Sequence, residues 1–222
     1  MTPPLVFESI QLTDRTATPF GLEVPAHQTV ALMGEEDSGI GQLARYALGL
    51  SLPARGRVLV YGEEIRGLAS REALAFRRRV GYLPAGDGLL QNLSLKDNVA
   101  LPLRFGSDLS EREIEGRLQV MLAAVRVHRM AHLRPAQASE EQRRRAAFAR
   151  ALAFDPALVI LDHPFDGLSN RAAAELLELA RGGESVEGSR RAIFIVGQDL
   201  PDILVHRIEL RYRLVRGLLT RE

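Results

Sequence analysis

The stretch from Ser139 to Ser169 constrains the fold more than any other part of the chain. Its first half combines alanines along one stripe with arginines around them, which predicts a helix packed closely on a flat surface. Pro156 prevents that helix from continuing. Residues 157–161 form a short apolar run, typical of a strand buried on both faces of a parallel sheet. Asp162 then stands at the carboxyl end of the strand, where open α/β sheets bind their ligands.

This stretch resembles the signature helix and Walker B strand of ATP-binding-cassette (ABC) nucleotide-binding domains. The resemblance is carried by Ala149-Arg150-Ala151-Leu152, Asp155-Pro156 and Leu161-Asp162-His163-Pro164. It implies an α/β fold of the P-loop NTPase (RecA-like) type, with a parallel core sheet, an antiparallel β lobe and a helical lobe. We expect one domain over residues 1–222, with the antiparallel lobe at about 1–28 and 57–66, the helical lobe at about 92–140 and the core in the remainder.

Composition limits the number of domains, the classes of partner and the cellular location that we expect. A chain of 222 residues that is 46% hydrophobic can bury one sizeable core. Lys and Arg number 29 against 28 Asp and Glu, so no overall charge favours nucleic acid as a partner. The absence of cysteine excludes disulfides and thiolate chemistry. The longest apolar runs fall far short of the ~20 residues that cross a bilayer, and the first residues do not resemble a signal peptide, so we expect a cytoplasmic protein.

Residues 29–50 have the order of a phosphate-binding loop: an apolar strand at 29–33, a glycine-bearing loop and a helix at 43–50. Gly34 and Gly39 keep the G-x-x-x-x-G spacing, but Ile40 and Gly41 stand where Lys and Ser or Thr are expected, and no lysine occurs in the loop. The resemblance therefore predicts a degenerate P-loop whose nucleotide-facing positions are Gly34, Ser38, Gly39, Ile40, Gly41 and Gln42.

The loop also carries Glu35, Glu36 and Asp37. A carboxylate about 4 Å from a phosphate charge costs roughly 1 kcal/mol in water and about 4 kcal/mol near a protein surface. If these acids face the loop, they repel a triphosphate; in the alternative arrangement they point to solvent and the loop is a tight connection. Either way, we expect ATP and Mg²⁺ to bind weakly or not at all, and no other cofactor.

The remaining catalytic positions of the family are also altered. The resemblance places Ala85 at the Q-loop glutamine, His163 at the catalytic glutamate and Gln198 at the switch histidine. Asp162 is then the one residue placed to hold Mg²⁺. The segment from about Leu12 to Thr16, where the family carries an aromatic ring that stacks on adenine, has no ring.

The signature segment reads Ser139-Glu140-Glu141-Gln142, with two glutamates where the family has glycines. If Glu140 and Glu141 face a partner's nucleotide, they repel it. If they form the first turn of a helix capped by Ser139, each stabilises that helix by roughly 0.3–1 kcal/mol through its dipole. Arg143, Arg144 and Arg145 follow, and we expect a solvated or interface face because no aromatic residues are interleaved with them.

Residues 92–103 resemble the run that opens the helical lobe of importer-type and lipid-transport ABC domains, and Pro164-Phe165 points to the ATPases of MCE (Mla-type) lipid transport. In the family this lobe grips a membrane subunit, and two ABC domains pair. The resemblance therefore implies a membrane permease as partner through the helical lobe, a homodimer or heterodimer with another ABC domain, and a location on the inner face of the membrane.

Two functions remain open. Our main hypothesis is a pseudo-ATPase, a catalytically degenerate subunit that serves as scaffold or regulator of a membrane transport complex, with lipid transport as the nearest setting. The alternative is a slow ATP hydrolase in which Asp162 holds Mg²⁺ and His163 acts as the base. A DNA-associated or ribosome-associated ABC protein fits poorly with near-neutral charge and one short domain.

Overall fold

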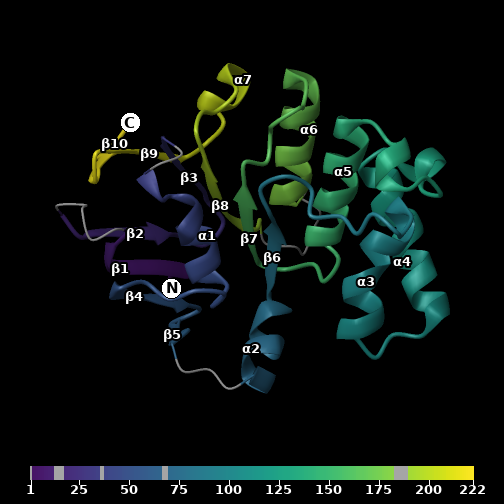
Figure 1. Cartoon of the computed structure of the whole chain (residues 1–222), viewed down its shortest axis with the longest axis horizontal. Helices are drawn as coiled ribbons and strands as arrows, with labels where there is room; N and C mark the ends of the chain where they lie inside the picture. The colour runs from purple at the N-terminus through teal and green to yellow at the C-terminus, as the bar shows by residue number, and fades with distance from the viewer. Residues whose placement is uncertain (1, 13–17, 36–37, 67–69, 183–189) are drawn as a thin grey trace.

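The computed structural model describes residues 2–12, 18–35, 38–66, 70–182 and 190–222, and its strands form two sheets (Figure 1). The first is four-stranded in the order β2-β1-β4-β5, and the second is six-stranded in the order β10-β9-β3-β8-β7-β6. The strands are β1 (Leu5–Gln11), β2 (Phe20–Val24), β3 (Thr29–Gly34), β4 (Arg55–Val60), β5 (Glu63–Glu64), β6 (Val80–Leu83), β7 (Leu158–Asp162), β8 (Ala192–Gly197), β9 (Leu210–Val215) and β10 (Leu218–Arg221).

The six-stranded sheet is the core of the molecule. Its strands β6, β7, β8, β3 and β9 run parallel, and β10 returns antiparallel to β9. Every residue of β3, β7 and β8 is buried. Alternate side chains of β7 enter two different apolar clusters, with Val159 and Leu161 on one face and Leu158 and Ile160 on the other. The prediction of a doubly covered parallel strand before Asp162 is therefore confirmed.

The helices are α1 (Gly41–Ala47), α2 (Ser70–Arg77), α3 (Leu95–Gly106), α4 (Glu111–Ala124), α5 (Glu140–Ala151), α6 (Asn170–Arg181) and α7 (Asp202–Val205), with 3-10 turns at His128–Met130 and Pro135–Gln137. Serine side chains cap α3, α4, α5 and α6 by accepting a backbone N–H of the first turn. The predicted helix at 43–50 is displaced, since α1 begins at Gly41 and ends at Ala47. None of the described helices is long and apolar enough to cross a membrane.

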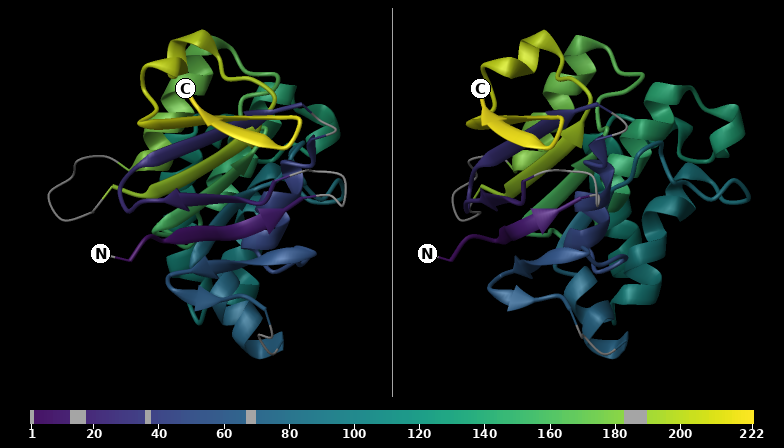
Figure 2. Two further views of the ribbon diagram at one scale, coloured as in Figure 1. Left: turned by 90° about the vertical axis from the view of Figure 1, so that its left-hand side faces the viewer. Right: turned by 60° about the vertical axis from the view of Figure 1, so that its left-hand side comes forward.

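The helices cover both sides of the core sheet. Figure 1 shows α1 on one side of the core sheet and α5 and α6 on the other, with α3 and α4 beyond α5. The four-stranded sheet shares its apolar cluster with α1 and the core sheet, and the Phe7 and Phe194 rings lie 5.4 Å apart between them. The side views place the hairpin β9–β10 and helix α2 at opposite ends (Figure 2). This arrangement is the P-loop NTPase-like α/β fold that the sequence predicts.

Two glycines provide a matched test of close packing. A Cβ atom at Gly81 on β6 would lie 2.6 Å from the Ala151 carbonyl oxygen of α5, whereas one at Gly116 on α4 would meet nothing within 4 Å. We expect Gly81→Ala to lower the free energy of unfolding by about 1–3 kcal/mol, because overpacking strains the contact. Gly116→Ala should raise it by about 0.5–1 kcal/mol through helix propensity. Urea denaturation measures both, and equal effects would contradict the assigned packing.

Candidate functional site

The loop after β3 is closed by its own side chains. Ile40, which stands at the position expected for lysine, is 2% exposed and belongs to the same apolar cluster as Leu43 of α1. A Cβ atom placed on Gly34 would lie 3.1 Å from Ser38 Oγ and 3.3 Å from Ile40 Cγ2, so both side chains fold onto Gly34. The lysine position is thus part of the hydrophobic core.

The backbone of this loop also bonds to itself. Ser38 N–H donates to the Glu35 carbonyl at 3.0 Å, Gln42 N–H to Gly39 and Leu43 N–H to Ile40, the last two at 2.9 Å. Gly39 has φ 79°, a conformation that favours glycine. The amide N–H groups of Ser38, Gln42 and Leu43 therefore already donate to carbonyls within the same segment. Glu35 is exposed, as the solvent-facing alternative requires, while Glu36 and Asp37 lie outside the described residues.

The carboxyl edge of β7 brings together several of the predicted positions. Asp162 is 7% exposed, and its Oδ1 lies 2.9 Å from His163 Nδ1. His163 has φ 47°, and its backbone N–H donates to the Val196 carbonyl of the neighbouring strand at 2.8 Å. A hollow of about 170 Å³ lies beside it, with Gln198 and Asp166 among its lining residues. Ala85 is exposed and does not line this hollow.

Tyr82 is a site residue that our sequence reasoning missed. It lies on β6, beside β7, one residue before the partner of Leu161. Burial first, and then the charge and a hydrogen bond of Asp162, raise the pKa of Tyr82 to about 12. Asp162 is therefore near enough to Tyr82 to raise its pKa, and it also contacts His163. The signal was present in the sequence, since Tyr82 comes near the end of a strand that parallel pairing sets next to Asp162.

The signature segment forms the capped first helical turn that the sequence predicts, and whether its glutamates also face a partner's nucleotide stays a prediction. Ser139 caps α5, and Gln142 completes a capping box: Gln142 N–H donates to Ser139 Oγ at 3.2 Å, and Ser139 N–H donates to Gln142 Oε1 at 2.9 Å. Glu140 and Glu141 form the first turn of the helix. The Glu140 carboxyl lies against Gly167, where a Cβ atom would be 2.3 Å from Glu140 Cδ. The Glu140 carboxyl group thus lies against the loop that follows β7.

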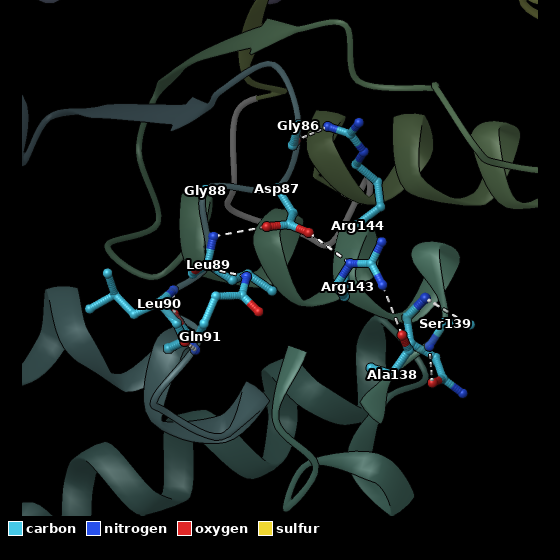
Figure 3. Close-up of polar contacts among 12 residues, drawn as sticks. Gly86, Asp87, Gly88, Leu89, Leu90, Gln91, Ala138, Ser139, Arg143 and Arg144 are labelled. Carbon is cyan, nitrogen blue, oxygen red and sulfur yellow. Dashed lines mark hydrogen bonds and ion pairs between the residues drawn. The ribbon is translucent and has the colours of Figure 1, made fainter. Parts of the chain in front are cut away.

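The prediction of a solvated arginine face on α5 is wrong for two of its three residues. Arg144 is 4% exposed and donates to the carbonyls of Pro84 and Gly86. Arg145 is 8% exposed and pairs with Glu141 and Glu175. Arginine side chains were expected outside because isolated charges are costly to bury, but here carbonyls and carboxylates surround them. Arg143 is less buried, and it pairs with Asp87 at 2.9 Å (Figure 3).

The structure bears on metal binding as well. Within the described ranges, no group of three or more His, Cys, Asp and Glu side chains is arranged to hold a metal ion. Asp162 is the predicted Mg²⁺ residue, and two neighbouring side chains already contact it. Mg²⁺ in proteins is commonly held by one or two carboxylates together with phosphate and water oxygens, so Asp162 as a Mg²⁺ residue stays a prediction. The segment expected to face adenine lies mostly outside the described residues, since only Leu12 of it is described.

The core position of Ile40 can be tested by restoring the lysine. We expect Ile40→Lys to lower the free energy of unfolding by about 2–4 kcal/mol, because the change removes apolar contacts and brings an ammonium toward the core. The matched control is Gln42→Lys, at an exposed position in the first turn of α1, which should change stability by less than about 0.5 kcal/mol. An Ile40→Lys protein of unchanged stability that binds Mg-ATP would contradict the assignment.

Tyr82 gives a prediction for alkaline pH. Its pKa is raised from the ordinary value of 10.0, so the folded state favours the protonated phenol. The corresponding stability is complete below pH 10.0 and is lost as the pH rises through about 12. In a tyrosinate absorbance titration, Tyr82→Phe should remove a tyrosine that titrates near the upper end of that interval. Loss of an early-titrating tyrosine instead would disprove the contact with Asp162.

Comparison with known proteins agrees with this geometry. The family model described as ABC transporter matches residues 18–166. The intermembrane phospholipid transport system ATP-binding protein MlaF of Haemophilus influenzae is 32% identical over 183 residues, which cover 82% of this chain and 69% of that protein. Methionine import ATP-binding protein MetN 2 of Pseudomonas aeruginosa is 34% identical over 161 residues, covering 72% of this chain and 48% of that protein.

Solved structures show the same fold. The dimeric structure of MJ0796, a bacterial ABC transporter cassette, matches with a TM-score of 0.84 over 98% of both chains at 22% sequence identity. The cbiO1 protein from Clostridium perfringens, part of the ABC transporter complex cbiONQ, matches with a TM-score of 0.79 over 98% of this chain and 87% of its own at 18% identity. With the family model covering residues 18–166, the chain belongs to the ABC transporter family.

Proposed function

We propose that this chain is a catalytically degenerate ABC subunit, which acts as scaffold or regulator of a membrane transport complex on the inner face of the membrane. The relatives named as ATP-binding proteins of intermembrane phospholipid transport suggest lipid as the cargo class. In this proposal the whole chain is one nucleotide-binding-like domain, and it acts through the surfaces that it presents to partners.

The observation that carries the proposal is the burial of Ile40. A P-loop holds phosphate with backbone N–H groups, a helix N-terminus and one ammonium, while a hydroxyl takes Mg²⁺. Here the ammonium position is an aliphatic side chain that is 2% exposed. Gly41, at the hydroxyl position, has no side chain to offer. Two of the contributions to phosphate binding are therefore absent, and the charges that remain in the loop are acidic.

The carboxyl edge of the core sheet supports the same conclusion. Phosphoryl transfer depends on positioned cations and on a group that orients water. Asp162 is engaged by Tyr82 and His163, and Gln198 lines the adjoining hollow without an ionisable group. Ala85 has no side-chain oxygen to contact a metal. Loss at all of these positions together favours a role without turnover.

The proposed partners follow from the two surfaces that the family uses. We place a membrane permease on the helical lobe, residues 92–140, and a second ABC domain, identical or different, on the face that carries Ser139 and Asp162. Sites in ABC dimers are composite, so this chain would impair both sites of any dimer that it joins. A role as the silent half of an ordinary motor is therefore excluded in favour of a scaffold or regulator.

One observation favours the alternative of a slow ATP hydrolase. His163 Nδ1 is fixed by Asp162 at 2.9 Å, which leaves the opposite ring nitrogen available beside the hollow of about 170 Å³. A histidine oriented by a carboxylate is a suitable general base. It still requires a bound phosphate, which the loop at Ile40 disfavours.

Titration and turnover separate the two functions. Calorimetric titration of the purified protein with Mg-ATP should give no micromolar binding, and a phosphate-release assay should give the same background for the wild type and for His163→Ala. Tight Mg-ATP binding would refute the proposal. Turnover that the histidine substitution abolishes would establish the hydrolase instead.

A further inference from the structure

The segment that joins the core sheet to the helical lobe is held by arginines of α5. This joint, residues 84–94, leaves β6 at the carboxyl edge of the core sheet and enters α3. The clamp, as we name it, consists of Arg143, Arg144 and Arg150, which project from α5 onto the first part of the joint (Figure 3 draws Arg143 and Arg144).

The clamp contacts nearly every acceptor at the start of the joint. Arg150 donates from Nη1 to the Gly88 carbonyl at 2.7 Å and from Nη2 to the Asp87 carbonyl at 3.0 Å. Arg144 donates to the Pro84 and Gly86 carbonyls. Arg143 donates from Nε to Asp87 Oδ2 at 2.9 Å.

The joint is shaped to present these acceptors. Gly86 and Gly88 have φ of 73° and 58°, and a Cβ atom on Gly88 would lie 2.8 Å from Pro84 Cγ and 3.1 Å from Arg150 Nη2. The carboxylate of Asp87 takes the Leu89 N–H on its other oxygen at 2.9 Å. The next amide, Leu90 N–H, donates to Asn98 Oδ1 of α3 at 2.7 Å. The hydrogen bonds thus run without interruption from α5 through the joint to α3.

Burial makes the clamp hard to open. Desolvation lowers the pKa of both Arg144 and Arg150, with nearby carboxylates acting in the opposite direction. Guanidinium remains charged at neutral pH, so movement of the joint away from α5 would leave a buried cation without its acceptors. Hydrogen bonds to charged groups are also the stronger class.

We propose that the arginine clamp fixes the helical lobe on the core sheet in one orientation without nucleotide, so that the lobe presents its surface to a partner constitutively. This inference rests on the proposed scaffold function and gives it a mechanism. Arg145 of the same helix is outside the clamp, since it pairs with Glu141 and Glu175 and thereby joins α5 to α6.

Amide hydrogen exchange followed by NMR tests the clamp in the nucleotide-free, full-length protein. The reporters are the amides of Leu89 and Leu90, and the internal reference is Lys96 N–H, which donates to the Ala131 carbonyl within the helical lobe. In the double variant Arg143→Gln with Arg150→Gln, we expect exchange at both reporters to accelerate at least about tenfold, with Lys96 unchanged.

The control variant is Arg112→Gln on α4, because Arg112 is exposed and forms no hydrogen bond or ion pair with the described part of the chain. Asp87→Asn provides a milder change that keeps an acceptor for Leu89 and removes the charge facing Arg143. It should accelerate exchange at Leu89 less than the double variant does, and so remains informative if the double variant fails to fold.

Two results would overturn the clamp. One is unchanged exchange at Leu89 and Leu90 in the folded double variant or in Asp87→Asn. The other is a change at these amides when Mg-ATP is added to the wild type. The first result leaves the scaffold function intact, because the calorimetric and turnover measurements test that function independently of the clamp variants. The second result implies that Mg-ATP binds, so it would contradict the clamp and the scaffold function together.

Discussion

Helix α5 must pack closely on the core sheet and must also keep its arginines paired, and the rest of the structure depends on how both requirements are met. Its alanines are buried, and they bring the helix backbone so close to the core sheet that Gly81 faces the Ala151 carbonyl oxygen. Its arginines lie on the other faces of the helix, where burial of an unpaired guanidinium would be costly. Arg143, Arg144 and Arg150 find acceptors on the joint, whereas Arg145 pairs with the carboxylate of Glu175 on α6. The helix therefore connects the core sheet, the joint and α6.

The same helix links the degenerate signature segment to the edge of the core sheet. Ser139 and Gln142 cap each other, and Glu140 turns back onto Gly167 in the loop after β7. In an ABC dimer this surface would approach the nucleotide of the other subunit. Here the carboxyl group occupies it within one chain. Negative charge at a helix N-terminus stabilises the helix, so Glu140 and Glu141 favour the fold at this position.

Much of this could be predicted from the sequence, because it depends on local pattern. Continuous apolar runs indicated β3, β7 and β8, and serines before polar first turns indicated the starts of α4 and α5. The loss of lysine, glutamine, glutamate and histidine at the family positions could also be read directly. The sequence did not indicate the contacts of Arg144 with the joint or of Arg145 with Glu175, because these partners lie on other elements. Tyr82 stands near the end of a short strand, but its place beside Asp162 depends on the pairing of β6 with β7, which the sequence did not specify.

The sequence by itself determined the fold class and the absence of phosphate-binding side chains, since periodicity and residue identity are properties of the chain alone. Only the tertiary structure decided that Ile40 belongs to the core, that Asp162 is shared between Tyr82 and His163, and that α5 arginines grip the joint. The physical reason is that burial and charge pairing depend on which elements pack together. An arginine that the sequence places in solvent is instead buried, and its guanidinium donates hydrogen bonds to carbonyls of a segment that is distant in the chain.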